Sequence, residues 1–175
     1  MKRRLSFGLA LGTLLAAGVH GQPVNEYEMK AAYLYNLAKF VEWPSKSFKS
    51  DRDPINICVF GQAPLLRALE EVVNGEKIEE RQLLVHRISD LQQAGNCHIL
   101  FVASSDPKNL RAVLRDIDPG ILTVGDAAGF AEDGGVANFS MQGNKVRVEI
   151  NVTAAHRQKL RISPKLLSLA QIVKQ

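Results

Sequence analysis

The sequence predicts one α/β domain: a mixed, mostly parallel sheet flanked by helices, with an antiparallel hairpin near its C-terminal end. Two patterns support this prediction. Short apolar runs alternate with amphipathic segments of about ten residues, as in βαβ units. After residue 144 the apolar residues alternate with charged ones instead, which is typical of antiparallel strands with one solvated face. Because no repeat, low-complexity tract or linker interrupts these patterns, we expect a single domain.

Residues 1–21 have the organisation of a secretory signal peptide. Lys2–Arg4 form a basic head, Leu5–Val19 is an apolar run, and small residues precede Gln22. We therefore expect residues 1–21 to be removed on export, which leaves residues 22–175 as a secreted or periplasmic α/β domain. The apolar run is too short to span a bilayer, and no later run approaches the roughly 18 residues that a span needs. No membrane insertion of the exported chain is expected.

The charge of the chain does not favour a nucleic-acid partner. The full sequence carries 22 Lys and Arg residues and 18 Asp and Glu residues. Removal of the three basic residues Lys2–Arg4 leaves 19 against 18, a net charge of +1. With no basic stripe either, we expect no nucleic-acid binding.

The first predicted element of the exported chain is a continuous helix over residues 26–41. It has two apolar faces at helical spacing, and Trp43-Pro44 ends it, because a proline disfavours helical conformation in the preceding residue. Such a helix must be sandwiched, either inside its own domain or between the domain and a partner. Six of the eleven aromatic residues lie between residues 27 and 48, which favours packing or interface roles. The residues predicted at a partner or dimer interface are Tyr33, Leu37, Phe40 and Trp43.

The remaining elements follow in order along the chain. Short apolar runs predict strands at residues 55–60, 83–88, 97–103 and 120–124. Helical periodicity predicts helices at residues 64–73, 89–93 and 107–117. Residues 136–141 and 145–150 are predicted as the hairpin, joined by Gln142-Gly143-Asn144. Two helices, at residues 154–160 and 164–173, are predicted to complete the domain.

Cys58 and Cys97 are the two cysteines of the chain. An even number of cysteines in an exported chain favours a disulfide. The bond would close a loop of about 40 residues, which a chain-entropy model values at roughly 4 kcal/mol. Two buried free thiols are the alternative.

The sequence lacks the usual catalytic motifs, with no Walker loop, no G-x-S-x-G elbow and no H-E-x-x-H pair. Residues 104–106 follow a strand at the end where open α/β sheets bind ligands, but a helix-capping turn is the simpler interpretation. Asp126, Glu132 and Asp133 could hold a hard cation, although their spacing matches no calcium loop. We therefore expect no enzymatic activity, no metal site and no cofactor.

One cationic pair could bind an anion. His156-Arg157 is predicted early in a helix that directly follows a strand, where backbone N–H groups favour negative charge. With Arg147 or Trp43 nearby, the pair could hold a carboxylate-bearing or aromatic small molecule. Solvated surface charge is the simpler interpretation. The candidate ligand site therefore consists of Trp43, Arg147, His156 and Arg157.

Six stretches resemble, in their order and spacing, one known family. They are E-x-x-M-K-A-A-Y-L-Y-N-L-A-K-F-V-E-W-P from Glu26, I-N-I-C-V-F-G from Ile55, C-H-I-L-F-V from Cys97, I-L-T-V-G-D from Ile121, G-G-V-A-N-F from Gly134 and K-V-R-V-E-I-N from Lys145. Across nearly the whole exported chain, these stretches are similar to the YfiR family of periplasmic regulators.

The resemblance implies a non-enzymatic periplasmic inhibitor. Similar proteins bind the periplasmic sensor region of an inner-membrane diguanylate cyclase, YfiN, and an outer-membrane lipoprotein, YfiB, relieves the inhibition. By motif position, Cys58 and Cys97 match a cysteine pair that forms a disulfide in the family, whereas a second pair of the relatives has no counterpart here. We therefore expect a homodimeric negative regulator of cyclic-di-GMP signalling and biofilm formation. A periplasmic sensor that binds a small molecule is the alternative.

Overall fold

The structure is a computed structural model that describes residues 25–61, 63–103, 110–143 and 145–173. Its described strands form one eight-stranded sheet and a separate two-stranded pair. From one edge to the other, the large sheet comprises β10 (Gln171–Val173), β8 (Lys145–Asn151), β7 (Ala137–Gln142), β6 (Leu122–Gly125), β5 (Ile99–Val102), β2 (Ile55–Phe60), β4 (Arg81–Ile88) and β3 (Lys77–Ile78). The small pair consists of β1 (Val41–Glu42) and β9 (Arg161–Ile162).

The central strands of the large sheet are parallel. β4, β2, β5, β6 and β7 pair in that order, each parallel to the next. β8 is antiparallel to β7, β3 is antiparallel to β4, and β10 runs parallel to β8. The predicted mixed, mostly parallel sheet with an antiparallel hairpin is therefore confirmed.

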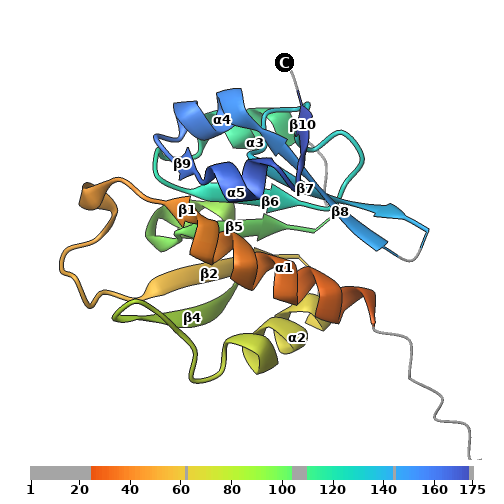
Figure 1. Cartoon of the computed structure of the whole chain (residues 1–175). Coiled ribbons are helices and arrows are strands. Elements are labelled where there is room, and N and C mark those ends of the chain that lie inside the picture. Colours follow the sequence, from red (N-terminus) through yellow and green to blue (C-terminus); the bar gives the residue numbers. More distant parts are fainter. Residues whose placement is uncertain (1–24, 62, 104–109, 144, 174–175) are drawn as a thin grey trace, which may run out of the picture.

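Helices cover both faces of this sheet (Figure 1). On one face, α1 lies between α2 and α5, and it contacts both of them. The other face is covered by the 3₁₀ helix η2 and by α3, whose apolar residues share a cluster with the strands. The helices are α1 (Glu26–Phe40), α2 (Ala63–Val73), α3 (Leu110–Asp116), α4 (Val152–Arg157) and α5 (Pro164–Leu167), with the 3₁₀ helices η1 (Ser45–Ser47) and η2 (Leu91–Asn96). Within the described part of the chain, no helix has the length and apolar character needed to cross a bilayer.

The two faces of β2 belong to two separate hydrophobic clusters. Ile57 and Val59 point to the side of α1 and α2, and Cys58 points to the side of η2 and α3. All three side chains are almost fully buried. A strand that is covered on both faces has a continuous apolar sequence, which is why residues 57–60 show no alternation of apolar and polar side chains.

Three predicted helices differ from those in the structure. The helix predicted over residues 164–173 ends at Leu167, and Gln171–Val173 forms β10, where its backbone pairs with the edge of β8. The segment predicted at residues 154–160 begins earlier, at Val152, and ends at Arg157. The short helix expected at residues 89–93 is η2, and Asp90 caps it by accepting a hydrogen bond from the Gln92 N–H. The start predicted for the helix at residue 107 lies outside the described residues.

The ring of Phe130 lies between two glycines and is fully buried. A Cβ atom at Gly125 would lie 2.2 Å from Cδ2 of Phe130, and one at Gly135 would lie 2.0 Å from its Cε1. Both separations are far below van der Waals contact. The absence of side chains at these two positions therefore makes room for the ring, which packs in the cluster on the η2 side.

We expect Gly135→Ala to destabilise the fold by about 1–3 kcal/mol or more, because the added methyl group must displace a ring that has no free space around it. Denaturant unfolding of Gly135→Ala, of Phe130→Leu and of the variant that combines both changes measures the effect. The smaller leucine should relieve the clash, so the double variant should lose less stability than the sum of the singles. Strict additivity would show that the ring is not the cause.

Candidate functional site

One face of α1 is buried against the sheet, and its first turn is capped by Asn25, whose side chain accepts a hydrogen bond from the Tyr27 N–H. The buried residues of this face are Lys30, Ala31, Leu34, Leu37 and Ala38. The predicted continuous helix is confirmed and ends one residue earlier than expected, because Val41 already pairs with Ile162 in the small sheet. The helix is therefore sandwiched on one side only, and its outer side is partly exposed.

This second face forms an outer stripe, defined by Met29, Tyr33, Asn36 and Phe40 at helical spacing. Tyr33 is 37% exposed, and its ring lies 6.0 Å from the ring of buried Phe139 in β7. Met29 and Phe40 are half-buried against the core, and Asn36 is exposed. The outer stripe thus combines the exposed ring of Tyr33 and the exposed amide of Asn36 with two half-buried apolar side chains.

Two of the four predicted interface residues do not belong to this surface. Leu37 is 2% exposed and lies in the main core, so its prediction as a contact residue is wrong for this folded chain. Trp43 is partly buried, and its indole N–H donates a hydrogen bond to the carbonyl oxygen of His98 at 3.1 Å. Its main role is therefore to fasten the segment after α1 to the start of β5.

Trp43 belongs to an aromatic–histidine cluster with Phe48, Arg81 and His98. The rings of Phe48 and His98 stack with centroids 4.4 Å apart, and Trp43 meets both edge-on. On the opposite face of Phe48, the guanidinium of Arg81 lies 3.7 Å from the ring centroid. Arg81 also donates hydrogen bonds to the carbonyl oxygens of Ser50 and Asp53. The cluster therefore joins the loop after α1 to both β4 and β5.

The imidazole of His98 is held in its neutral form by two backbone partners. Nδ1 accepts a hydrogen bond from the Asn56 N–H at 3.0 Å, so Nε2 carries the proton and donates it to the Ser47 carbonyl at 3.0 Å. Desolvation lowers the pKa of His98 below its ordinary value of 6.5, and the charge of Arg81 acts in the same direction. The Ser47 carbonyl and Asp53 oppose this shift without cancelling it.

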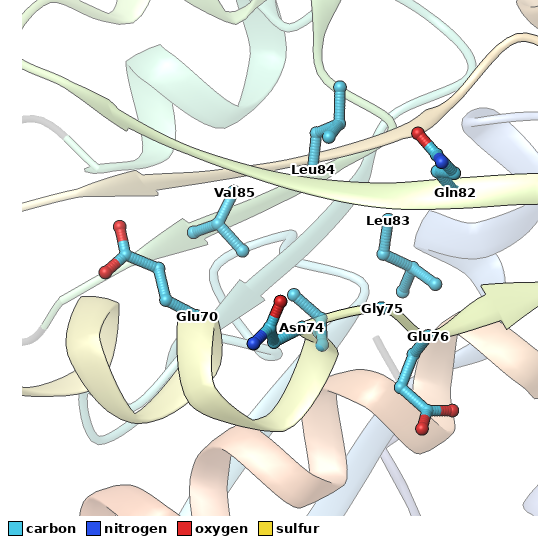
Figure 2. A pocket seen from close by; sticks show the side chains of 9 residues that line it. Glu70, Asn74, Gly75, Glu76, Gln82, Leu83, Leu84 and Val85 are labelled. Carbon is cyan, nitrogen blue, oxygen red and sulfur yellow. The ribbon is translucent and has the colours of Figure 1, made fainter.

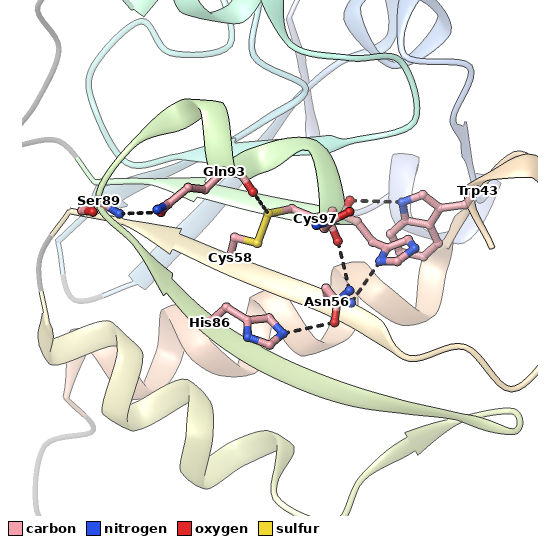
Figure 3. Close-up of a disulfide and its surroundings, with 9 residues drawn as sticks. Trp43, Asn56, Cys58, His86, Ser89, Gln93 and Cys97 are labelled. Atoms are coloured by element: carbon pink, nitrogen blue, oxygen red, sulfur yellow. Dashed lines mark hydrogen bonds between the residues drawn. A yellow bond between two sulfur atoms is a disulfide. The ribbon is translucent and has the colours of Figure 1, made fainter. Parts of the chain in front are cut away.

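A disulfide joins Cys58 of β2 to Cys97, directly before His98 (Figure 3). The two Cα atoms lie 5.8 Å apart, and both residues are buried. Beside the bond, the Asn56 side chain donates to the Asn96 carbonyl and accepts from Nε2 of His86. The structure thus contains the disulfide expected from the sequence and surrounds it with polar side chains from neighbouring strands.

An open groove of about 1050 Å³ runs alongside this disulfide. Its lining includes Lys46, Lys49, Asn56, His86 and His98. The groove borders the N-terminal ends of β2 and β5 and extends along β4 as far as Ile88, whereas open α/β sheets usually bind ligands at the carboxyl ends of their strands. The residues predicted there for a ligand-binding turn, 104–106, lie outside the described residues.

Lys30 is a buried cation on the core side of α1. Its Nζ lies 2.7 Å from Oδ2 of Asp126, directly after β6, and also pairs with Glu26. Burial alone would lower the pKa of Lys30, but the hydrogen bonds to Asp126 and Glu26 outweigh it and the pKa is raised. The ion pair anchors α1 to the carboxyl end of the sheet. It also engages Asp126, one of the three acidic residues considered above as ligands of a hard cation.

The structure gives no support to a metal site in that acidic cluster. Asp133 pairs with Arg111, as Asp126 does with Lys30. Across the described ranges, no group of three or more His, Cys, Asp or Glu side chains could bind a metal ion.

The anion site predicted around His156 and Arg157 rested on a wrong helix position. Both residues lie in the last turn of the six-residue α4, where unpaired carbonyl groups favour cations rather than anions. Arg147 lies on an exposed position of β8, opposite Ser140 of the hairpin. A groove of about 520 Å³ lined by Trp43 does not include any of these three residues. The groove beside Trp43 therefore does not bring the four predicted residues together.

The aromatic–histidine cluster was not predicted, because its members come from three separate segments of the chain. One signal in the sequence could have indicated part of it. Cys97-His98 and Asn56-Ile57-Cys58 lie on strands that a disulfide would place side by side, so His98 would fall near Asn56.

We expect stability to fall on mild acidification because of His98. As the pH falls through 6.5, the unfolded chain takes up a proton on this histidine, while the folded chain does so only at a lower pH. The stabilisation is therefore complete above pH 6.5 and is lost as the pH falls towards the lower, folded pKa. Denaturant unfolding between pH 7.5 and 5 should show that the free energy of unfolding depends less steeply on pH in His98→Phe than in the wild type. The exposed His156, as His156→Phe, is the matched control, and an unchanged slope in His98→Phe would contradict the assignment.

Removal of the disulfide, as Cys58→Ala with Cys97→Ala, should cost about 4 kcal/mol, because the bond closes a loop between residues 39 apart in the sequence. Equilibrium unfolding of the oxidised wild type and the double variant measures the difference. Equal stabilities would show that the bond does not restrict the unfolded chain.

Comparison with known proteins supports a relationship at the level of a family. A solved structure of a conserved domain protein from Vibrio cholerae has a TM-score of 0.57 and 13% identity. The match covers 85% of this chain and 60% of the other chain, so it shows a shared fold only. No curated protein matches this sequence significantly. The model of the YfiR/HmsC-like family, however, matches residues 27–171. The chain therefore belongs to the YfiR/HmsC-like family, a regulatory family of periplasmic proteins that act on diguanylate cyclases.

Proposed function

We propose that the protein represses an inner-membrane diguanylate cyclase of the YfiN type by binding its periplasmic sensor region. Repression would lower cyclic-di-GMP and biofilm formation, without any catalytic turnover by the repressor itself. The observation that carries this proposal is the outer stripe of α1, an apolar surface on a member of a family that regulates such cyclases.

The chemistry of the outer stripe suits a protein partner. Tyr33 presents a rigid ring whose inner edge is already fixed against Phe139, so little side-chain freedom would be lost on binding. Half-buried Phe40 extends the surface towards α5, where Nζ of Lys165 lies 5.4 Å from its ring centroid. Partly buried aromatic residues of this kind are enriched among the residues that dominate interface energies.

The small net charge supports the same interpretation. An exported chain of residues 22–175 would carry a net charge of +1, so long-range electrostatic steering would contribute little to association. Affinity would then come mainly from apolar and aromatic contacts such as those of the outer stripe. The proposal includes export by residues 1–21 and a homodimeric state. It also includes relief of repression by an outer-membrane lipoprotein of the YfiB type.

A second candidate function is a periplasmic sensor for a small molecule. The groove beside the disulfide favours this function, because its lining includes two cationic residues, Lys46 and Lys49, and two residues with side-chain amides, Asn56 and Asn96. In this case a ligand would bind at the N-terminal ends of β2 and β5. Its binding would not require the outer stripe.

Deletion of the gene should raise cyclic-di-GMP and surface attachment, and the exported wild type supplied in trans should reverse both. Tyr33→Ala should weaken binding to the isolated cyclase sensor region by about 30-fold, equivalent to about 2 kcal/mol for a central aromatic contact. Lys39→Ala, an exposed change on another face of α1, is the matched control and should bind normally. The readouts are calorimetry with the sensor region and complementation in the cell.

Two results would contradict the proposal. One is a deletion that leaves cyclic-di-GMP unchanged while the purified protein binds a periplasmic metabolite, which would favour the sensor function. The other is equal binding by Tyr33→Ala and the wild type, which would exclude the outer stripe as the contact surface. Thermal unfolding of both variants separates lost contact from lost folding.

A further inference from the structure

The outer edge of β4 is long and mostly unpaired. β3 covers only Arg81 and Gln82, and no described strand pairs with the edge over residues 83–88. On its inner side, β4 pairs with β2 without interruption from Leu83 to Ile88. The open stretch contains no proline and no bulge, two of the devices that prevent an edge strand from pairing with another chain, and Arg87 is its one charged residue.

The backbone groups available at this edge follow from the hairpin between β3 and β4. Ile78 and Arg81 pair across a two-residue turn, so the N–H and C=O of Arg81 point to the outer side. Because these groups alternate along a strand, those of Leu83, Val85 and Arg87 point outward as well. Three residues therefore offer unpaired donors and acceptors to an added strand.

A pocket of about 290 Å³ lies beside the edge, between β4 and the end of α2 (Figure 2). Val73, Leu83 and Val85 supply its apolar lining, and Glu70 and Glu76 its carboxylates. Glu76 accepts a hydrogen bond from the Tyr35 hydroxyl. Glu70 makes no ion pair with any described residue, so the pocket suits a cationic side chain with an apolar stem.

The same edge carries such a side chain. Arg87 has the strand parity of Leu83 and Val85, so its Cβ leaves β4 on the α2 side, and the exposed residue also borders the groove beside the disulfide. Like Glu70, it forms no ion pair among the described residues. On α2, exposed Arg67 lies about one turn before Glu70 and pairs with Glu71. The surface is thus basic towards one end and acidic towards the other, which makes it complementary to itself in antiparallel orientation.

We propose that a second copy of this chain pairs with β4 antiparallel, about a twofold axis beside His86. In this register Val85 of each copy lies opposite Arg87 of the other, and each such pair exchanges two backbone hydrogen bonds. Arg87 of the second copy then extends over Val85 towards Glu70. The antiparallel α2 helices place Arg67 of one copy near Glu70 and Glu71 of the other.

The symmetry of this contact explains why the occupant is a second copy. Each complementary charge pair forms twice about the axis, and the contact uses up the open edge in both copies, so the assembly closes at two. The pairing surface is separate from the outer stripe of α1. It assigns a surface to the homodimer of the proposed function and leaves α1 free for another partner.

Sedimentation equilibrium of the exported, oxidised domain tests the proposal through charge reversal. Glu70→Arg and Arg87→Glu should each weaken the dimer by about tenfold or more, since every lost ion pair is lost twice by symmetry. The double variant should dimerise more strongly than either single variant, because the pair between positions 70 and 87 reforms with opposite sign. Arg147→Glu, an exposed reversal on the distant hairpin, is the control and should dimerise normally. All changes are at exposed positions, and circular dichroism checks that each variant is folded.

Hydrogen exchange supplies a second readout that does not depend on charge. The amides of Val85 and Arg87 should exchange more slowly as protein concentration rises through the dimerisation range. The proposal would be overturned if the wild type were still monomeric at about 100 µM. A dissociation constant of that size corresponds to an association free energy of roughly −5.5 kcal/mol. A dimer that the single reversals do not weaken, or one that Tyr33→Ala dissociates, would also overturn the proposal. If Glu70→Arg abolished cyclase binding but left the dimer intact, the edge would belong to a strand of the cyclase instead, while the proposed repression itself would stand.

Discussion

The packing of α1 on the sheet is the constraint on which much of this structure depends. A parallel sheet needs apolar cover on both faces, and α1 supplies the middle of one cover, between α2 and α5. Ala31 and Ala38, both almost fully buried, keep its contact surface flat, while Leu34 and Leu37 fill the space between helix and strands. Once this face is buried, the opposite side of the helix has no layer left to pack against. The exposed outer stripe is therefore a direct result of how the sheet is covered.

The burial of Lys30 belongs to the same constraint. A charged amine on the core side of a helix is costly unless an opposite charge meets it there. Asp126 meets it from the loop directly after β6, and Glu26 from the preceding turn of the helix. The pair thus links the first two turns of the helix to the carboxyl end of β6. Further along the same helix, Tyr33 of the outer stripe lies beside Phe139.

The sequence allowed the sheet to be predicted because its central strands are buried on both faces and therefore appear as largely apolar runs, as at residues 57–60. It also allowed α1 and the hairpin to be predicted, since each has a clear period. The C-terminal segment was harder to predict. Leu166, Leu167, Ala170 and Val173 match a helical period, yet Gln171–Val173 lies along β8, because an open edge nearby offered backbone partners that no local pattern reveals.

The candidate site was predicted less well than the fold, for a related reason. Leu37 and Tyr33 are both apolar positions of one helix, and only the placement of the sheet shows that the first is enclosed and the second exposed. His156 and Arg157 moved from an expected helix start to a helix end because α4 begins two residues earlier than its pattern suggests. The contact of Trp43 and Phe48 with Arg81 and His98 depends on strand order, which residue spacing does not encode.

The position of the disulfide has a consequence for the order of assembly. The loop that it closes contains α2, β3, β4 and η2, and every residue of this loop precedes Cys97. In a chain that enters the periplasm N-terminus first, oxidation can thus join β2 to the start of β5 before β6 to β10 have arrived. The early half of the sheet would then serve as a covalently closed template, on which the later strands are added one after another.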